Sequence, residues 1–384
     1  MFEIIEKEAG GTVIKVIGVG GAGGNAVEHM IRESVQGVEF ICANTDSQAL
    51  ARSSAQQKLQ FGPGLGAGGR PDKARALAEA ERERIAEALD GAHMAFITAG
   101  MGGGTGTGAA PIVAEVAREL GILTVAVVTK PFEFENAKRM RVAEEGLAEL
   151  ARHVDSLIVI LNERLTEVLG EDISMVEAFK TADNVLRNAV GGIAEIINVP
   201  GLVNVDFEDV RTVMGEMGKA MMGSAAAAGV DRARLAAEQA VASPLLEGIE
   251  LSGARGVLVN ISASKGLGMK EVREVMDTIR AYAAEDAHII FGTVFDEAME
   301  DGLRVTVVAT GLGVAASQQL RPRMEVVAQK TGTDNAPLIE TINYGELEVP
   351  AVIRSGRRPA TVEAMAASGM DRLDIPAFLR KQAD

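Results

Sequence analysis

Two glycine-rich loops constrain the fold of this chain more than any other feature. The first reads Gly18-Val-Gly-Gly-Ala-Gly-Gly-Asn25 and the second reads Gly100-Met-Gly-Gly-Gly-Thr-Gly-Thr-Gly108; each follows an apolar run and precedes a helix-patterned segment. Glycine lets the backbone approach phosphate oxygens closely, and a helix start offers free N–H groups and the positive end of its dipole. The two loops therefore predict a phosphate-binding edge on an α/β fold.

Runs rich in Val and Ile alternate with helix-patterned segments through the first half of the chain. The runs are apolar on both faces, which predicts a parallel, doubly wound sheet covered by helices on both sides. The expected strands are residues 12–18, 38–43, 94–99, 123–129 and 155–161, and the expected helices are residues 25–34, 71–89 and 109–120.

The second half of the chain has a different pattern. Residues 174–198 carry apolar side chains at three- and four-residue steps over much of the helix girth, which predicts a long helix buried between two layers. A smaller α+β domain is expected behind it, with strands at 256–261, 288–294 and 303–310 and a helix at 269–282. The expected domains are an N-terminal extension (1–11), a nucleotide-binding domain (12–173), a central helix (174–202) and a C-terminal α+β domain (203–316).

The C-terminal residues have the composition of a linker followed by a short binding peptide. Residues 317–370 carry six basic and six acidic residues with little periodicity, which predicts a disordered linker. In residues 371–384, Ile375, Phe378 and Leu379 lie at helical spacing, and Pro376 suits the first turn of such a helix. This spacing suits a helix that docks in a groove of a partner, and the alternative is an inert terminus.

Composition excludes several classes of function. With 38 basic and 54 acidic residues, the net charge of −16 argues against general nucleic-acid binding, which needs a basic face. Cys42 is the only cysteine, so an intrachain disulfide and a cysteine-based zinc site are excluded. The longest apolar stretch, residues 120–128, is too short to cross a bilayer, and we expect a cytoplasmic protein without direct membrane insertion.

The glycine loops leave two kinds of nucleotide open. Gly18, Gly20 and Gly23 satisfy G-x-G-x-x-G, which also fits an NAD-dependent oxidoreductase. The second loop and a third glycine-rich stretch at residues 64–69 favour a triphosphate held from several sides. The P-loop motif G-x-x-x-x-G-K-[ST] does not occur in the sequence, so a P-loop NTPase is excluded.

Three motifs together carry a resemblance to a known family. The run GGGTGTG at residues 102–108 resembles the tubulin signature, and it is accompanied by NVDFEDV at 204–210 and LDIPAFLRKQ at 373–382. With these motifs the chain is similar to the FtsZ family of tubulin-like bacterial cell-division GTPases, from residue 12 to 313 and again at the tail. The resemblance implies GTP/GDP binding with Mg²⁺ and hydrolysis activated by polymerisation. It also implies a head-to-tail homopolymer that forms the mid-cell division ring beneath the inner membrane and recruits other division proteins.

The resemblance also implies which residues contact the nucleotide. Glu135 matches the family's ribose contact and Arg139 its phosphate contact, although two such residues four apart on a helix also form surface ion pairs. Asp183 matches the position that reads guanine, because a carboxylate can accept from N1–H and the 2-amino group, and Phe179 would lie against the ring. The full set of candidates is Gly21, Ala22, Gly23, Gly24, Asn25, Gly104, Thr105, Gly106, Thr107, Glu135, Arg139, Asn162, Phe179 and Asp183.

Asp206 and Asp209 are the candidate catalytic residues. By the resemblance they polarise the water that attacks the γ-phosphate held by the neighbouring subunit, whereas without it they are acids that stabilise a helix start. A site divided between two faces of one subunit makes a heterologous contact, which repeats into an open filament. Hydrolysis is then expected to require assembly. A polymerising scaffold without turnover is a further alternative, which the acid pair argues against.

The remaining expectations concern partners and metals. The tail residues Leu373, Asp374, Ile375, Pro376, Phe378 and Leu379 match the peptide through which the family binds the membrane anchors FtsA and ZipA, and division regulators are further expected partners. No metal-ligand cluster is visible in the sequence, so Mg²⁺ is expected only with the triphosphate. Arg70 and Leu161 depart from the commoner family pattern and leave details of phosphate and ribose contact open.

Overall fold

The computed structural model describes residues 11–169, 173–199, 201–203, 205–216, 218–243, 254–284 and 287–312. The N-terminal residues 1–10, the predicted linker and the predicted tail peptide lie outside these ranges. The strands are β1 Ile14–Val19, β2 Glu39–Asn44, β3 Gln57–Gln60, β4 Met94–Gly100, β5 Leu123–Lys130, β6 Ser156–Leu161, β7 Gly218–Ala228, β8 Gly256–Ala263, β9 His288–Phe295 and β10 Gly302–Leu312. The α-helices are α1 Gly20–Arg32, α2 Ser47–Arg52, α3 Pro71–Glu79, α4 Arg82–Leu89, α5 Thr105–Glu119, α6 Ala137–Leu150, α7 Asn162–Leu169, α8 Met175–Asn198, α9 Phe207–Met214, α10 Arg232–Val241 and α11 Met269–Tyr282.

The described strands form one sheet in the order β3-β2-β1-β4-β5-β6-β7-β10-β8-β9. The ladder is parallel from β3 to β7, β10 runs antiparallel to both of its neighbours, and β9 is parallel to β8. The chain adds strands in one direction from β1 to β3 and in the other direction from β4 to β6. The sheet is therefore doubly wound, with its topological switch point between β1 and β4.

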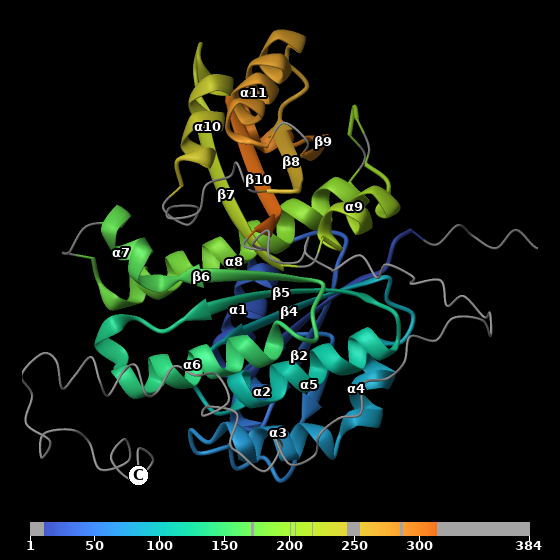
Figure 1. Ribbon diagram of the computed structural model, residues 1–384, viewed down its shortest axis with the longest axis vertical. Helices are drawn as coiled ribbons and strands as arrows, with labels where there is room; N and C mark the ends of the chain where they lie inside the picture. Colours follow the sequence, from blue (N-terminus) through green and yellow to red (C-terminus); the bar gives the residue numbers. More distant parts are fainter. Residues whose placement is uncertain are drawn as a thin grey trace, which may run out of the picture. The chain divides into compact units, whose positions relative to one another are not determined.

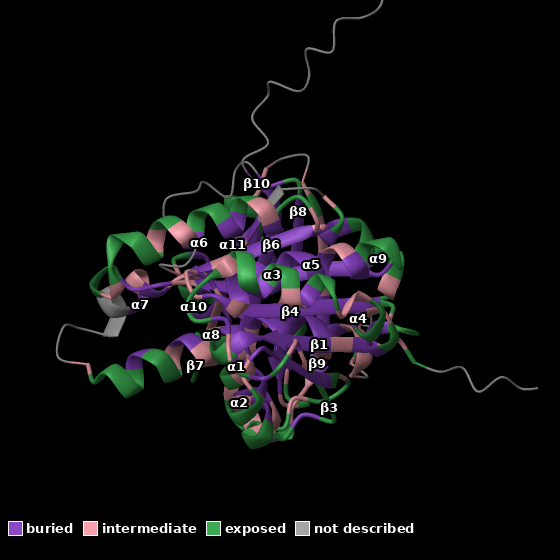
Figure 2. Ribbon diagram, turned by 90° about the horizontal axis from the view of Figure 1, so that it is seen from below, coloured by how far each residue is buried: buried purple, intermediate pink, exposed green. Residues whose placement is uncertain are grey.

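Alternate residues of each central strand pack against helices on opposite faces of the sheet. In β1, Ile14 and Val16 belong to the core beneath α1, α8 and α9, whereas Ile17 and Val19 belong to the core beneath α3, α4, α5 and α6. Figure 2 shows these strands buried and the outward sides of the helices exposed. The period of two matches a strand covered on both faces, as the sequence predicts.

The long helix and the smaller C-terminal part also follow the prediction. Helix α8 begins at a capping box formed by Ser174 and Glu177 and runs along the sheet (Figure 1). Beyond it, α10 and α11 pack on the strands β7, β8 and β10 around a third core cluster. The sheet continues through this part, because β7 pairs with β6 at Ser156–Gly218, Leu157–Lys219 and Ile158–Ala220.

Several element boundaries differ from the sequence-based expectation. The helices after the two glycine loops begin at Gly20 and Thr105 rather than at residues 25 and 109, because glycine's poor helix propensity hides a first helical turn from pattern analysis. The predicted helix 71–89 is two helices that break at Ala80 and Glu81, although both residues are good helix formers. Strand β7 and the elements α2, β3, α7 and α10 were not predicted.

Candidate functional site

The two glycine loops meet at the switch point of the sheet. The first loop follows β1 and the second follows β4, the two neighbouring strands at which the strand order reverses. A Cβ built on Gly20 would lie 2.9 Å from the nitrogen of Gly106, so the loop backbones are in direct contact. The hydroxyls of Thr45 and Thr105 are 2.7 Å apart and tie the end of β2 to the same place. Ligands of doubly wound sheets bind in this crevice.

The glycines of the loops divide into packed and open positions. A Cβ on Gly23 would overlap the carbonyl oxygen of Thr98, and a Cβ on Gly106 would lie 2.5 Å from that of Gly100, so these two glycines allow close backbone packing. A Cβ on Gly21, Gly24 or Gly103 would meet nothing within 4 Å. The open positions present bare backbone to the space in front of the loops, as a phosphate cradle requires.

Both helices that follow the loops begin without a side-chain cap. Among the described residues, neither α1 nor α5 has a capping side chain or an acidic residue in its first turn. In contrast, Asp46, Asn136, Ser174 and Asp206 cap α2, α6, α8 and α9. Free N–H groups and two positive dipole ends therefore converge on the open glycines, and this arrangement favours an anion.

Glu135 and Arg139 lie at the start of α6, on the carboxyl side of β5. Glu135 Oε2 lies 2.8 Å from Arg139 Nη1, and Glu135 Oε1 accepts from the N–H of Phe132 at 2.9 Å. Between them, Asn136 has φ +100° and caps α6 by accepting from the N–H of Lys138. A Cβ on Gly102 of the second loop would lie 2.7 Å from the carbonyl oxygen of Arg139, so the pair borders the phosphate cradle.

Phe179 and Asp183 lie one turn apart on α8. The ring of Phe179 is 39% exposed and meets the buried ring of Phe132 edge-on, with centroids 5.2 Å apart. Asp183 is partly buried, and this burial raises its pKa to about 6 even though His29 and Arg32 act to lower it. An exposed ring edge beside a partly desolvated carboxylate suits a flat, polar base with hydrogen-bond donors.

The asparagines at the site are not equivalent. Asn25 is exposed on the first helical turns of α1. Asn162 is 4% exposed, and its Oδ1 has no hydrogen-bond partner among the described residues. A buried acceptor without a partner is costly, which makes Asn162 available for a ligand donor. Sequence analysis missed Thr45, whose only signal is its place directly after a strand of the same sheet edge.

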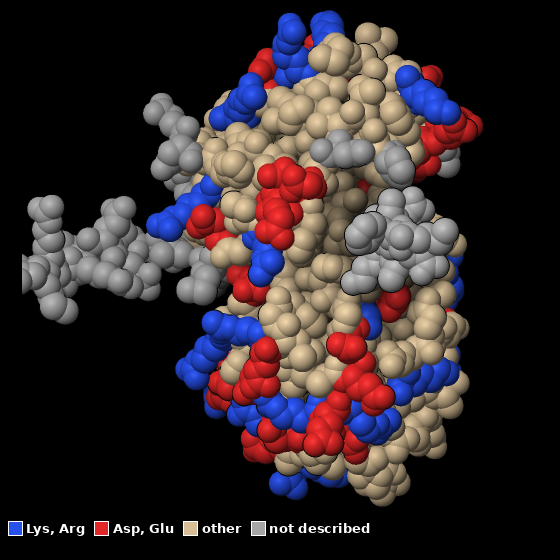
Figure 3. Space-filling model, turned by 90° about the vertical axis from the view of Figure 1, so that its right-hand side faces the viewer, with Lys and Arg blue, Asp and Glu red and all other residues tan. Residues whose placement is uncertain are grey.

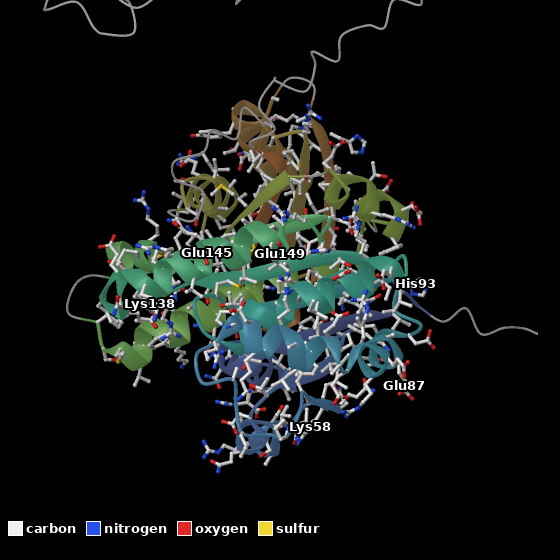
Figure 4. All side chains as sticks on the ribbon, turned by 60° about the horizontal axis from the view of Figure 1, so that its bottom comes forward. Lys58, Glu87, His93, Lys138, Glu145 and Glu149 are labelled. Carbon is white, nitrogen blue, oxygen red and sulfur yellow. The ribbon has the colours of Figure 1, made fainter. Side chains whose placement is uncertain are left out.

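Asp206 and Asp209 lie at the opposite edge of the sheet. Asp206 caps α9 by accepting from the N–H of Asp209 at 2.8 Å, and both side chains are exposed. The ring of Phe207 lies 6.0 Å from that of His93, which directly precedes β4, whereas the second glycine loop follows β4. Seven residues of strand separate these two edges by about 20 Å. Figure 4 shows His93 at one end of the sheet and Lys138, beside the Glu135–Arg139 pair, at the other.

Comparisons with known proteins match both parts of the described fold. The family model "Tubulin/FtsZ family, GTPase domain" matches residues 13–170, and "FtsZ family, C-terminal domain" matches residues 218–313. The cell division protein FtsZ of Pseudomonas aeruginosa is 53% identical over 394 aligned residues and 100% of both chains; that of Coxiella burnetii is 54% identical over 388 residues and 99% of both. The chain belongs to the FtsZ family.

A solved structure supports the same conclusion for the fold. An empty FtsZ dimer from M. jannaschii superposes with a TM-score of 0.75 at 42% identity, covering 79% of this chain and 89% of that one. The predicted tubulin-like fold and the predicted GTPase activity are therefore confirmed. FtsZ-family proteins are cell-division GTPases, so the first glycine loop belongs to a GTPase and not to an NAD-dependent oxidoreductase.

Some expectations fall outside what the described residues can address. The tail residues Leu373, Asp374, Ile375, Pro376, Phe378 and Leu379 lie outside the described ranges. Within those ranges, no group of three or more His, Cys, Asp and Glu side chains is arranged to hold a metal ion. A search of the same ranges finds no helix with the length and hydropathy of a membrane span.

Proposed function

We propose that this FtsZ-family GTPase holds GTP at the carboxyl edge of its sheet and hydrolyses it with acids from the opposite edge of a neighbouring subunit. The phosphates lie against residues 21–25 and 104–107, where open glycines and uncapped helix starts converge. Glu135 contacts the ribose and Arg139 the phosphates once their mutual ion pair is exchanged for the nucleotide. Asn162 donates a hydrogen bond to the nucleotide, or accepts one from it, at the rim of the same site.

In this proposal, side chains of α8 recognise the guanine base. The Asp183 carboxylate accepts from N1–H and the 2-amino group, and the exposed edge of Phe179 packs on the ring. Adenine lacks this pair of donors, so the carboxylate selects against it. Mg²⁺ enters with the triphosphate and is held by its phosphates and by water, since the described residues offer no acidic cluster of their own.

The position of the acid pair is the observation that carries the proposal. Asp206 and Asp209 lie about 20 Å of strand away from the glycine loops, too far to act on a nucleotide held by the same chain. Figure 3 looks onto this end of the molecule, with a group of acidic side chains at the level of α9. Stacking the α9 end of one subunit on the glycine loops of the next completes the site and repeats into an open filament.

Asp206 and Asp209 have different structural roles. Asp206 caps α9, whereas the Asp209 carboxylate has no hydrogen bond or ion pair among the described residues. An acid whose structural contribution is the modest helix-dipole term in the first turn of α9 can be replaced without loss of the fold, so Asp209 is the better variant for a functional test. We expect Asp209→Ala to bind GTP and assemble like the wild type and to lose nearly all turnover, by about a hundredfold or more.

Phosphate release measured across a protein concentration series, with pelleting of the same samples, tests the shared site. We expect GTP turnover per subunit to be near zero in dilute protein and to rise with the amount of pelletable polymer. Turnover per subunit that stays constant on dilution would place the whole site within one chain and remove the role of Asp206 and Asp209 in the neighbour. Normal turnover by the Asp209→Ala variant would contradict the catalytic assignment directly.

The domain organisation and the cellular role are part of the proposal. We place the nucleotide-binding domain at 12–173, the central helix at 174–202, the C-terminal domain at 203–316, the linker at 317–370 and the partner-binding peptide at 371–384. The family matches at 13–170 and 218–313 support the two folded domains. We propose a cytoplasmic filament at the mid-cell ring, attached to the membrane through FtsA- and ZipA-type anchors that bind the peptide. Pull-down with the peptide deleted tests the anchor contact.

A further inference from the structure

His29 is a buried titratable residue to which the proposed reaction gives no role. It lies on α1 and is 8% exposed. Its Nε2 is 2.6 Å from Oδ1 of Asn184 on α8. Because an amide oxygen only accepts, the imidazole donates this hydrogen bond through Nε2–H.

The hydrogen bond joins the two helices that would hold the two ends of the nucleotide. Helix α1 starts at the phosphate cradle, and His29 follows Asn25 by four residues on the same face. Helix α8 carries Phe179 and Asp183, and Asn184 is the residue directly after Asp183. The His29 ring lies within electrostatic range of the Asp183 carboxyl and acts, with Arg32, to lower its pKa.

The rest of the contact between α1 and α8 is mainly apolar. Met30 and Val190 are fully buried members of the same core cluster. Apolar packing sets which face of α8 is buried, but it supplies no directional bond at the turn that carries Asp183 and Asn184. A further polar contact of α8, from Asn198 Nδ2 to the carbonyl of Gly37 in the loop after α1 at 2.7 Å, lies 14 residues further along α8, or about 20 Å. The His29–Asn184 bond is the polar contact beside the base site.

We propose that His29 is a positioning residue for guanine recognition. Through Asn184 it fixes the orientation of this turn of α8, and thereby the direction in which the Asp183 carboxylate faces the base. The proposal rests on the function proposed above, specifically on Asp183 as the acceptor for the guanine edge. A purely structural role for His29 predicts a different result, because loss of packing weakens every nucleotide alike.

Equilibrium binding of GDP and inosine diphosphate to the full chain separates the two roles. Inosine keeps N1–H and lacks the 2-amino group. The ratio of the two dissociation constants therefore reports how well the Asp183 carboxylate is oriented toward the guanine edge. We expect His29→Ala to lower the preference for GDP over inosine diphosphate about three- to tenfold, the equivalent of one hydrogen bond, because inosine has only the N1–H contact with Asp183 to lose. His29→Gln should restore most of the ratio, because its amide N–H can donate to Asn184.

Two further variants control the experiment. Asn184→Ala removes the acceptor of the same bond and should lower the ratio as His29→Ala does, with no further loss in the double variant. Asn184 is less buried than His29, so this variant carries the test if His29→Ala does not fold. Val190→Ala loosens the same helix contact without touching the bond and should leave the ratio unchanged.

The outcomes distinguish the two proposals. A wild type that binds GDP and inosine diphosphate equally, or binds neither, would overturn the assignment of Asp183 and with it the proposed guanine site. The role of His29 alone would be overturned by a different result. In that case the wild type prefers GDP over inosine diphosphate, and the His29→Ala variant keeps the wild-type ratio or binds both ligands equally more weakly.

Discussion

At the scale of single residues, Asp183 shows a conflict between stability and binding. Burial opposes the charge of its carboxylate, and His29 and Arg32 compensate only in part. A charge that the fold disfavours is retained where a ligand needs it. The raised pKa of about 6 is therefore consistent with a binding role and has no structural benefit.

The pH dependence of GDP binding follows from that pKa. Above pH 6 the Asp183 carboxylate is ionised and offers an acceptor to each of the two guanine donors. Below pH 6 it carries a proton and offers an acceptor to only one of these donors. We expect the affinity for GDP to be constant from pH 7 to 8 and to fall by up to about tenfold per unit below pH 6. Fluorescence competition at several pH values measures this, and Asp183→Asn should abolish the dependence.

The same variant should be more stable than the wild type without nucleotide. The pKa of Asp183 is higher in the folded than in the unfolded chain, so its ionisation costs folding free energy above pH 6, and that cost disappears as the pH falls toward 4. Asp183→Asn removes the cost at pH 7.5. We expect the thermal midpoint of Asp183→Asn to rise while its preference for guanine is lost. A midpoint below that of the wild type would contradict this prediction.

Two glycines of one loop offer a matched pair of substitutions. A Cβ on Gly21 meets open space, whereas a Cβ on Gly23 overlaps the Thr98 carbonyl. We expect Gly21→Ala to change the free energy of unfolding by less than about 1 kcal/mol and to weaken GTP binding strongly, because its methyl group occupies the phosphate space. Gly23→Ala should lower the thermal midpoint by itself. Unfolding scans with and without nucleotide separate the two effects, and unimpaired binding by Gly21→Ala would argue against the cradle.

At the scale of elements, Asp206 caps α9 and, in the proposed function, also takes part in hydrolysis. Asn caps helices as well as Asp does, so Asp206→Asn should keep α9 intact while removing the charge. Asp206→Ala should cost about 1 kcal/mol of stability in addition. We expect both variants to lose turnover in pelleted polymer and only the alanine variant to unfold earlier. If Asp206→Asn hydrolyses GTP normally, the charge is dispensable and Asp206 is only a cap.

A largely buried ion pair joins helices α10 and α11 of the C-terminal part. Arg232 of α10 is 8% exposed, its Nε lies 2.6 Å from Glu271 of α11, and its Nη1 donates to the Asp301 carbonyl. We expect Arg232→Ala to destabilise this part by about 3–5 kcal/mol, because it leaves Glu271 partly buried without its cation. Arg232 lowers the pKa of Glu271, so the contribution is present at neutral pH and lost as the pH falls below about 4.5.

The exposed pair Lys265–Glu297 is the control for that prediction. Its atoms are also 2.6 Å apart, but both side chains are about three-quarters exposed. Lys265→Ala should change stability by at most about 1 kcal/mol. Equal destabilisation by Lys265→Ala and Arg232→Ala in urea titrations would show that burial does not decide the strength of these pairs.

The elements that sequence analysis missed share a physical cause. Strand β7 ends in Ala225–Ala228, and alanine has little intrinsic preference for strands; the segment is a strand because β6 pairs with its start and β10 pairs along its length. The early starts of α1 and α5 are concealed by glycines whose freedom serves the ligand. Strongly periodic segments such as α8 and α11 were predicted within one residue because their packing and local preference agree.

The motifs and the resemblance supplied the parts of the candidate site and its division between two subunits, but not the distance between the two parts within one chain. Motif spacing located the glycine loops, and the resemblance assigned Glu135, Arg139 and Asp183. No sequence pattern shows that the start of α9 lies at the amino edge of β4, because that depends on how the 24-residue helix α8 spans the sheet. This distance is a tertiary property, and the proposal that each subunit depends on its neighbour rests on it.

At the scale of the whole molecule, a site divided between two ends predicts complementation. Asp209→Ala subunits keep the glycine loops and lack the acid, whereas subunits with a blocked cradle, such as Gly21→Ala, keep the acids and do not hold GTP. Each variant alone should be inactive. Mixed in equal amounts, about a quarter of random head-to-tail contacts place an intact cradle against intact acids, and phosphate release should reappear only in the mixture. A mixture as inactive as its components, with co-pelleting shown, would mean that the acids act within their own chain.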